Sequence, residues 1–270
     1  KTQIFHGLAG EKKGHFRIRH YFDLYLTQGP YFTDTFNLLK QKHKDFDVIE
    51  TGWPKLDIYG RDKAGFNSEK EALLKTYNAK TILLYAPTFS PKLTSAPYLV
   101  NHIKALANNK DYLILLKFHP LMDKSWVDAY ESLAKAHKNI VYQTEKNIIK
   151  FLLLSDLLIS DTSSVIYEFL LLDKPVVSFN NISKNINWED SSDFSELENL
   201  VENNLKVDPF AKSRAYICEQ FHPYNDGKSA LRMVDSVSDY IKEHGVPEKR
   251  KLSLLRKLKI YSIFGKPSKR

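Results

Sequence analysis

The stretch LLLSDLLISDTSSVIYEFLLLDKPVVSF, residues 152–179, shows the pattern that decides the fold. Its apolar run Leu157–Ile159 predicts a strand, which leads directly into Ser160-Asp161-Thr162-Ser163-Ser164. An apolar helix is predicted over 165–172, and a second strand over 175–179. This succession of strand, crossover helix and strand indicates a βαβ unit on a parallel sheet.

Small hydroxylated residues fill the junction between this strand and its helix. Backbone N–H groups at a helix N-terminus lack partners within the helix, and Thr162, Ser163 and Ser164 add O–H donors beside them. Such a cluster suits an anion, above all a phosphate. Asp161, Thr162 and Ser163 are also typical capping residues, so capping without a ligand is an equally open interpretation at this point.

Strands and helices alternate regularly around this junction. Predicted strands cover 81–85, 112–117, 140–142, 156–159 and 175–179, and predicted helices cover 98–107, 124–136, 147–153 and 165–172. Parallel sheets bind ligands beyond the carboxyl ends of their strands. Three polar turns lie there, namely APTFS after Tyr85, FHP after Lys117 and SDTSS after Ile159. We therefore expect Pro87 and Thr88 to share one rim with the other two turns.

A shorter series of the same kind precedes this half. Strands are predicted over 23–27 and 47–51, with a helix over 31–42 between them. Gly29-Pro30 and Gly52-Trp53-Pro54 break these elements. The remaining predicted helices cover 68–77, 194–204 and 228–244.

Histidines and lysines near the strand ends are candidates for chemistry. His6-Gly7 opens the glycine-bearing loop HGLAGEKKG, in which Lys12 and Lys13 add positive charge. A histidine at such a position suits a general base, and a structural histidine in a turn is the alternative. Lys117 and His119 share one face of an extended chain and could together neutralise a diphosphate. A surface lysine beside a capping histidine is the alternative there.

Two further groups of residues carry weaker signals. Glu168 lies one helical turn after Ser164, where it could accept hydrogen bonds from ribose hydroxyls or be a solvated helix residue. Lys228, Ser229 and Arg232 open another predicted helix with residue types that suit a phosphate. Nucleotide-binding loops of the Walker and GxGxxG types, a GxSxG motif and zinc-ligand spacings are absent from the sequence. A metal is therefore not demanded.

Composition predicts a globular protein of a reducing compartment. With 43% apolar and 13% aromatic residues, the 270-residue chain can bury a core in one large α/β unit or two smaller ones. The single cysteine, Cys218, excludes a disulfide framework and is expected to be a buried spectator. No apolar run is long enough to span a membrane. Because Lys1 is not a starting methionine and no signal pattern follows it, we expect an excised segment.

The net charge of +8 is concentrated at the C-terminal end. Residues 248–270 contain nine basic residues and one acid, so residues 1–247 sum to zero. Leu254, Leu255, Leu258 and Tyr261 fall at helical spacing among these cations. A basic helix with an apolar face is typical of binding to anionic lipid surfaces. A tail docked on its own domain, or disordered, is the alternative, and no element typical of nucleic-acid recognition accompanies it.

Taken together in order, six motifs resemble the CDP-glycerol glycerophosphotransferase family, the teichoic-acid and capsule polymerases and primases. They are His6-Gly7, ETGWPKLD (50–57), YAPTFS (85–90), KFHP (117–120), SDLLISDTSSVIYEFLLLDKPVV (155–177) and DGKSALR (226–232). The similarity covers most of residues 1–243. It implies a GT-B architecture, in which two Rossmann-like domains face each other across a cleft, with the first one truncated here.

The resemblance also implies roles for individual residues. His6 matches the histidine taken as the base that activates an acceptor hydroxyl, and His119 matches one placed near the donor phosphates. Ser163 and Ser164 match serines that meet the diphosphate, and Glu168 stands where the family usually has Asp. Two departures are Thr162, where an aromatic residue is usual, and Leu8-Ala9-Gly10-Glu11, which replaces the usual Thr-Pro continuation.

These observations predict a division of the chain and an activity. Residues 1–67 are expected to form the C-terminal part of an acceptor-side Rossmann-like domain, and residues 68–78 a linker. Residues 79–247 are expected to form the Rossmann-like domain that binds the nucleotide donor, and residues 248–270 a basic amphipathic tail. The donor-binding set is expected to be Pro87, Thr88, Lys117, Asp161, Thr162, Ser163, Ser164 and Glu168. Possible phosphate or acceptor contacts are Lys12, Lys13, Lys228, Ser229 and Arg232.

The expected reaction moves glycerol phosphate from CDP-glycerol to a hydroxyl of a cell-wall or capsule polymer or a lipid-linked acceptor, without a cofactor. The expected place is the cytoplasmic face of a bacterial membrane, reached through the tail and without nucleic acid. A CDP-ribitol donor, a GT-B sugar transferase or nucleotide-sugar epimerase, and a non-enzymatic membrane-surface binding module remain open as alternatives.

Overall fold

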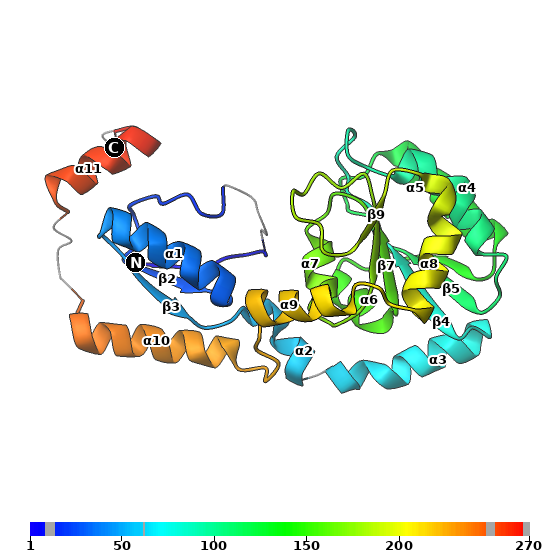
Figure 1. Cartoon of the computed structure of the whole chain (residues 1–270), viewed down its shortest axis with the longest axis horizontal. Helices are drawn as coiled ribbons and strands as arrows, with labels where there is room; N and C mark the ends of the chain where they lie inside the picture. Colours follow the sequence, from blue (N-terminus) through cyan, green and yellow to red (C-terminus); the bar gives the residue numbers. More distant parts are fainter. Residues whose placement is uncertain (9–13, 62, 247–251, 267–270) are drawn as a thin grey trace. The chain divides into compact units, whose positions relative to one another are not determined.

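The chain forms two α/β units, each built around its own parallel sheet (Figure 1). The computed structural model describes residues 1–8, 14–61, 63–246 and 252–266. Unit 1 combines Lys1–Arg61 with Glu219–Arg270, and unit 2 comprises Asp62–Cys218. The predicted α/β class, with parallel sheets flanked by helices, is confirmed.

Unit 1 contains a three-stranded sheet in the order β1-β2-β3, and both strand pairs are parallel. Its elements are β1 (Thr2–Gln3), β2 (Leu24–Thr27), α1 (Pro30–His43), β3 (Asp47–Glu50), the 3-10 turn η1 (Pro54–Leu56), α2 (Asp57–Arg61), α10 (Ser229–His244) and α11 (Leu254–Phe264). Helix α9 (Ala211–Phe221) runs from unit 2 into unit 1. The strand predicted over 47–51 and the helix predicted over 31–42 are therefore confirmed.

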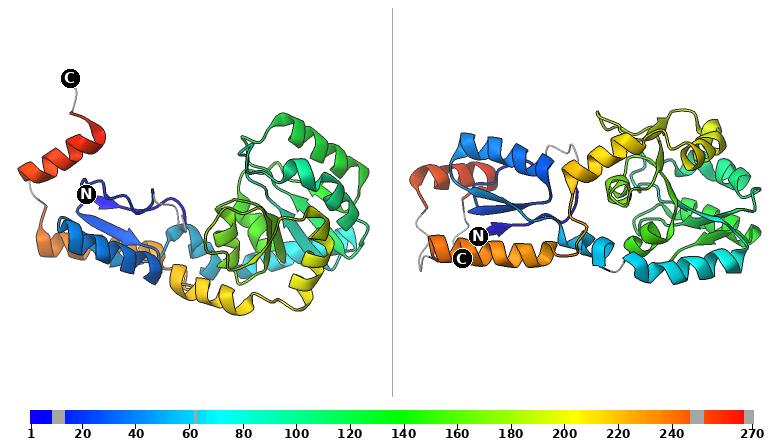
Figure 2. Two further views of the ribbon diagram at one scale, coloured as in Figure 1. Left: turned by 45° about the horizontal axis from the view of Figure 1, so that its top comes forward. Right: turned by 60° about the horizontal axis from the view of Figure 1, so that its bottom comes forward.

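Different helices cover the two faces of the unit 1 sheet. Successive side chains of a strand point to opposite faces. Tyr25 of β2 packs with Phe36 of α1, whereas Leu24 and Leu26 pack with Met233 of α10. Figure 2 shows α1 and α10 on either side of these strands. Residues 24–26 thus contribute side chains to two hydrophobic clusters, one on each face of the sheet.

Unit 2 contains a six-stranded, fully parallel sheet in the order β6-β5-β4-β7-β8-β9. Numbered within the unit, this order reads 3-2-1-4-5-6, the strand order of a Rossmann fold. Its elements are η2 (Lys63–Phe66), α3 (Asn67–Tyr77), β4 (Thr81–Tyr85), α4 (Ala96–Leu106), β5 (Tyr112–Leu116), α5 (Lys124–Ala136), β6 (Ile140–Tyr142), α6 (Ile148–Leu154), β7 (Leu157–Ser160), α7 (Val165–Leu170), β8 (Val176–Phe179), β9 (Glu189–Ser191), η3 (Phe194–Glu196) and α8 (Leu197–Lys206). The chain order reverses between β4 and β7, and such a switch point is where ligands bind in folds of this kind.

The central strands of unit 2 are apolar because both of their faces are covered. The core on one face joins Tyr85 and Ile114 to Leu99 of α4, Tyr130 of α5 and Val201 of α8. Helices α6 and α7 contact β4, β7 and β8 from the other face. Runs such as TILLY and YLILL therefore lack the polar alternation of a half-exposed strand.

The predicted domain boundaries are wrong in two places. Residues 219–247 were assigned to the donor domain, but the described part of this range belongs to unit 1, because α10 packs its apolar face on β2 and β3. Residues 68–78 were assigned to a linker, but α3 belongs to unit 2. Ion pairs join Lys70 to Asp156 and Glu69 to Lys150, and these pairs fasten α3 to the β7 and α6 region. An amphipathic sequence pattern predicts a helix but not the sheet against which that helix packs.

Strands β1 and β9 and helix α9 are among the elements that were not predicted from the sequence. Strands β1 and β9 have two and three residues, too few for a periodic pattern, and α9 carries no clear apolar stripe. The helical spacing in the tail is confirmed as α11. Within the described ranges, no helix has the length and apolar character needed to cross a bilayer.

Candidate functional site

Three loops follow the carboxyl ends of β4, β5 and β7 in unit 2, and we call them the switch-point loops (residues 86–95, 117–120 and 161–164). The Asp161 carboxylate joins the first loop to the third. Its Oδ1 accepts the Thr88 N–H at 2.8 Å, and its Oδ2 accepts the Ser95 N–H at 2.8 Å and the Ser95 hydroxyl at 2.9 Å. This side chain thus links two of the three loops that were expected to share one rim.

Burial defines the role of Asp161. The side chain is fully buried, and desolvation raises its pKa to about 6, against the lowering effect of its hydrogen bonds. Both carboxylate oxygens already accept donors from the neighbouring loop. The side chain positions the backbone around Thr88 and Ser95. A direct contact of Asp161 with the donor stays a prediction.

The side-chain hydroxyl groups that follow Asp161 make few hydrogen bonds within their own loop. Ser164 is the exposed N-cap residue of α7 and makes no side-chain capping bond. The Ser163 hydroxyl accepts the Val165 N–H at 3.4 Å, which is a long contact. The Thr162 hydroxyl is bonded outside this junction, because its Oγ1 accepts the Ile182 N–H at 3.3 Å. Capping alone therefore does not account for the two serines.

A lysine and a histidine lie in the loop after β5. Lys117 is buried, its Nζ donates to the Phe118 carbonyl at 3.0 Å, and burial lowers its pKa. His119 is exposed and stacks on Phe89 of the first switch-point loop, with 4.4 Å between ring centroids. Its Nδ1 accepts the Leu121 N–H at 3.1 Å, so the neutral ring carries its proton on Nε2. Desolvation first and Lys117 second lower the His119 pKa, which favours that neutral form.

The other two predicted donor residues are less accessible than expected. Pro87 is buried in the loop after β4. Glu168 is buried in α7 with 6% of its surface exposed, so the alternative of a solvated helix residue is wrong.

His6 lies in unit 1, in the loop that follows β1. We call Phe5–Gly7 the histidine loop. The His6 side chain is exposed, and the carbonyl groups on either side of it are both hydrogen-bonded. The Trp53 indole Nε1 donates to the Phe5 carbonyl at 2.8 Å, and the Gln28 amide Nε2 donates to the Gly7 carbonyl at 3.2 Å. Lys12 and Lys13 lie outside the described residues.

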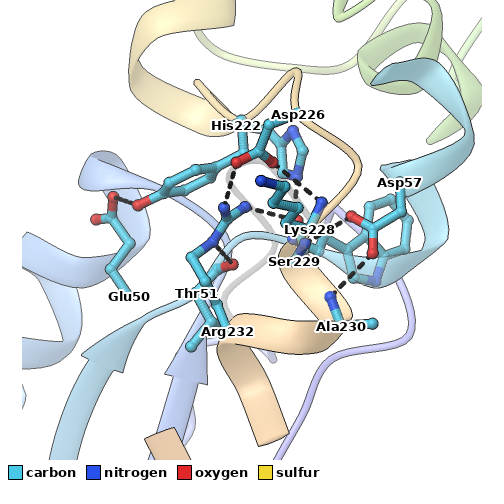
Figure 3. Close-up of polar contacts among 11 residues, drawn as sticks. Glu50, Thr51, Asp57, His222, Asp226, Lys228, Ser229, Ala230 and Arg232 are labelled. Carbon is cyan, nitrogen blue, oxygen red and sulfur yellow. Dashed lines mark hydrogen bonds and ion pairs between the residues drawn. The ribbon is translucent and has the colours of Figure 1, made fainter. Parts of the chain in front are cut away.

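The N-terminus of α10 already holds an anion of the protein itself. Asp57 accepts the Ser229 N–H through Oδ1 and the Ala230 N–H through Oδ2, each at 2.9 Å (Figure 3). Lys228 is the exposed N-cap residue, and its N–H is bonded to Asp226. The backbone N–H groups of Lys228 and Ser229 therefore have acceptors within the protein, and phosphate contacts at these two residues stay a prediction.

Arg232 is likewise committed within unit 1. Its guanidinium donates to the Thr51 carbonyl at 2.8 Å, to Asp226 at 2.7 Å and to the Ser229 hydroxyl at 3.2 Å, as Figure 3 shows. The same group lies 4.1 Å from the centre of the Tyr224 ring. These contacts use its planar face and its donors together, and a phosphate contact at Arg232 stays a prediction.

The segment after β3 is shaped by the same network. The Tyr224 hydroxyl donates to Glu50 at 2.6 Å, and the Trp53 N–H donates to Nε2 of buried His222 at 3.0 Å. Gly52 has a φ of +85°, and a Cβ there would lie 2.4 Å from the Ser229 hydroxyl oxygen. Only glycine fits this left-handed, crowded position. The motifs ETGWPKLD and DGKSALR are therefore two halves of one structural assembly.

Sequence reasoning missed the residues that position others: Trp53, Gln28, His222 and Ser95. Trp53 is part of one predicted break and Gln28 precedes another, but nothing local in the sequence shows which carbonyl each side chain would reach. Among the described residues, no three His, Cys, Asp or Glu side chains are placed to hold a metal ion together.

A sequence model of the family described as CDP-Glycerol:Poly(glycerophosphate) glycerophosphotransferase matches residues 11–184. The chain is 28% identical over 225 residues to a teichoic acid poly(ribitol-phosphate) polymerase of Bacillus spizizenii, which covers 75% of the chain and 35% of that protein. It is 24% identical over 245 residues to a teichoic acid glycerol-phosphate primase of Bacillus subtilis, which covers 80% of the chain and 58% of that protein. The chain thus spans less than two thirds of these relatives.

Solved structures share the fold. The wall teichoic acid polymerase TagF superposes with a TM-score of 0.61 at 19% identity, over 90% of this chain and 68% of the other. The Staphylococcus aureus MnaA–UDP structure superposes with a TM-score of 0.58 at 13% identity, over 84% of this chain and 63% of the other. Both are GT-B-like, so the expected GT-B-like fold is confirmed.

Proposed function

This chain belongs to the CDP-glycerol:poly(glycerophosphate) glycerophosphotransferase family, and from that membership we propose that it transfers a polyol phosphate from a CDP-linked donor to a hydroxyl of a cell-wall polymer. Glycerol phosphate is the proposed group, and a capsule polymer is a second possible acceptor. The proposed reaction requires no cofactor.

The observation that carries the proposal is the set of switch-point loops in unit 2. Ser163 and Ser164 present hydroxyls that capping does not consume, and His119 stacks on Phe89 with its Nε2–H available. Asp161 holds the backbone of the first loop in place behind them. This arrangement offers neutral donors to a diphosphate, which suits the charge that develops on its oxygens.

In the proposed reaction the acceptor hydroxyl oxygen attacks the β-phosphorus of CDP-glycerol. A bond forms between that oxygen and the phosphorus, and the bond from this phosphorus to the bridging oxygen breaks. CMP leaves with the bridging oxygen. His6 takes the hydroxyl proton, and donors such as His119 and Ser164 stabilise the charge on the phosphate oxygens. Because little covalent chemistry falls to the protein, positioning and electrostatics supply the rate enhancement.

Donor binding tests the identity of the nucleotide. Isothermal titration should show binding of CDP-glycerol that weakens by at least about tenfold in Ser164→Ala/His119→Ala, since two donors to the diphosphate are lost. CDP-ribitol is the second candidate, because one of the relatives is a ribitol-phosphate polymerase. Binding of UDP-sugars with no response to either CDP-polyol would instead favour a sugar transferase or epimerase. Vesicle binding alone would favour a membrane-surface module.

We further propose that the C-terminal helix α11 holds the protein peripherally on the cytoplasmic face of a bacterial membrane. Arg256 docks this helix on unit 1, where it donates to the carbonyls of His20 and Phe22 at 2.8 Å each. Leu254 and Leu255 are nevertheless 74% and 72% exposed. A docked helix with an outward apolar side and several lysines is suited to anionic lipid.

A further inference from the structure

The carbonyl groups of Phe5 and Gly7, the two neighbours of His6 in the sequence, each accept a hydrogen bond from a buried side chain. We infer that Trp53 and Gln28 are positioning residues for His6, and that they fix the histidine loop from two sides. This inference rests on the proposed function, in which His6 is the base. It assigns a purpose to the motif ETGWPKLD, which contains Trp53.

The indole of Trp53 holds the first carbonyl. Its Nε1–H donates to the Phe5 carbonyl at 2.8 Å, and 3% of the residue is exposed. Trp53 lies three residues after the end of β3, and this bond ties the histidine loop to that segment. A buried indole N–H needs an acceptor, which makes the bond costly to lose.

Trp53 is itself held by the assembly shown in Figure 3. Its backbone N–H donates to Nε2 of His222 at 3.0 Å, and burial lowers the His222 pKa to about 4, which keeps that nitrogen an acceptor. Gly52 before it is packed against Ser229 of α10. The position of Trp53 is therefore fixed through its backbone, and its indole in turn restrains the Phe5 carbonyl.

Gln28 holds the second carbonyl. It follows β2 and is 1% exposed, and its Nε2 donates to the Gly7 carbonyl at 3.2 Å. Gly7 itself has open space where a Cβ would stand, so side-chain packing does not fix the loop at that residue. The Gln28 bond provides the restraint there instead.

Loss of either bond should move a general base by a fraction of an ångström rather than remove it. Misplacement of a catalytic group by about 1 Å can lower a rate about 100-fold. Because the donor contacts lie in unit 2, the effect should fall on turnover and not on the affinity for CDP-glycerol. A purely structural role would instead lower the amount of folded protein.

The test uses Trp53→Phe and Gln28→Met, which keep much of the bulk and delete the donor. We expect kcat for transfer from CDP-glycerol to fall about 10- to 100-fold in each variant, with donor KM within about twofold. The NMR resonance of the His6 Cε1–H, assigned by its loss in His6→Ala, should shift in both. Trp188→Phe is the matched control, because its buried indole donates to Ser178 at 2.9 Å in unit 2. It should leave the His6 resonance unchanged.

Two results would overturn the inference: wild-type kcat in both variants, or a fall in kcat with an unmoved His6 resonance. If Trp53→Phe does not fold, Gln28→Met decides the matter alone. Absence of transfer in the wild-type protein would refute the proposed function instead. The His6 resonance would still report in that case whether Trp53 and Gln28 position the loop.

Discussion

At the scale of single residues, the most consequential side chain of unit 2 is one whose hydrogen bonds go to a neighbouring loop of the same unit. Asp161 accepts three hydrogen bonds from the loop after β4, although its burial disfavours the charged form. Its carboxylate is therefore a structural anion, kept because the Thr88 and Ser95 N–H groups need acceptors. Loops that carry ligand contacts depend on such fixed points.

Asp161→Asn tests this role. The amide can offer one oxygen, so its NH2 group would face N–H or O–H donors of the first switch-point loop. We expect a loss of about 1–3 kcal/mol in the free energy of unfolding, measured by urea denaturation. Asp123→Asn is the control, because Asp123 caps α5 on the surface and Asn caps equally well. Equal stability of both variants would contradict the account of Asp161.

Residue types near strand ends could be predicted from the sequence, but their partners could not. His119 and Ser164 were found because parallel strands bring their carboxyl ends to one rim. Arg232 was predicted as a phosphate contact because its residue type suits phosphate. One of its partners in the structure, the Thr51 carbonyl, lies 181 positions away in the sequence, and no local pattern encodes such a contact.

At the scale of elements, the N-terminus of α10 shows how unit 1 is closed. Asp57, at the start of α2, accepts two N–H groups of α10. The carboxylate also suits the positive end of the helix. Two chain segments more than 160 residues apart are joined there without any ligand.

Asp57→Ala should destabilise unit 1 selectively. Loss of this cap leaves the Ser229 and Ala230 N–H groups without their acceptor and should cost about 1–2 kcal/mol. Hydrogen exchange followed by mass spectrometry should show faster exchange in α10. Asp123→Ala removes the cap of α5 in unit 2 and should accelerate exchange there and not in α10. Protection of α10 that survives Asp57→Ala would show that its packing on β2 suffices.

His222 predicts a pH dependence of the same junction. Burial lowers its pKa to about 4 in the folded protein, from 6.5 in the unfolded chain, so the unfolded state binds more protons between these values. The free energy of unfolding should therefore fall as the pH drops from 6.5 to 4, by up to about 3 kcal/mol from this residue. Protonation of Nε2 also breaks its bond to the Trp53 N–H.

His222→Gln keeps an acceptor and removes the titration, so its stability should depend less on pH over this range. Burial also lowers the pKa of His15 to about 4, so part of the pH dependence of stability should remain in this variant. Urea denaturation at several pH values measures the slope. His137→Gln in unit 2 is the control. A slope as steep in His222→Gln as in the wild type would contradict this assignment.

At the scale of the whole molecule, the sequence predicted the two-part organisation and not where the chain returns. The alternation of strands and helices over 81–179 was sufficient to predict the parallel sheet of unit 2. Helix α10 follows unit 2 in the sequence and was therefore assigned to it. Its apolar stripe fits any sheet, and only the contact of Met233 with Leu24 and Leu26 shows which one.

The proposed binding of the tail to a membrane also belongs to this scale, and Leu255→Glu tests it. A charge in place of a 72% exposed leucine should lower binding to phosphatidylglycerol vesicles about 10-fold or more, since burial of a leucine is worth about 2 kcal/mol. Sedimentation with vesicles measures it. Leu231→Glu, at an exposed position of α10, is the control. Equal binding of all three proteins would contradict the membrane role of α11.

Transfer of glycerol phosphate from CDP-glycerol, followed as CMP release in the presence of a teichoic-acid acceptor, tests the central claim most directly. The account predicts that His6→Ala lowers kcat by at least about 100-fold with unchanged donor KM, because it removes the base. His119→Ala should lower kcat and raise donor KM, whereas His137→Ala should behave as the wild type. Undiminished CMP release by both His6→Ala and His119→Ala would contradict the assignment.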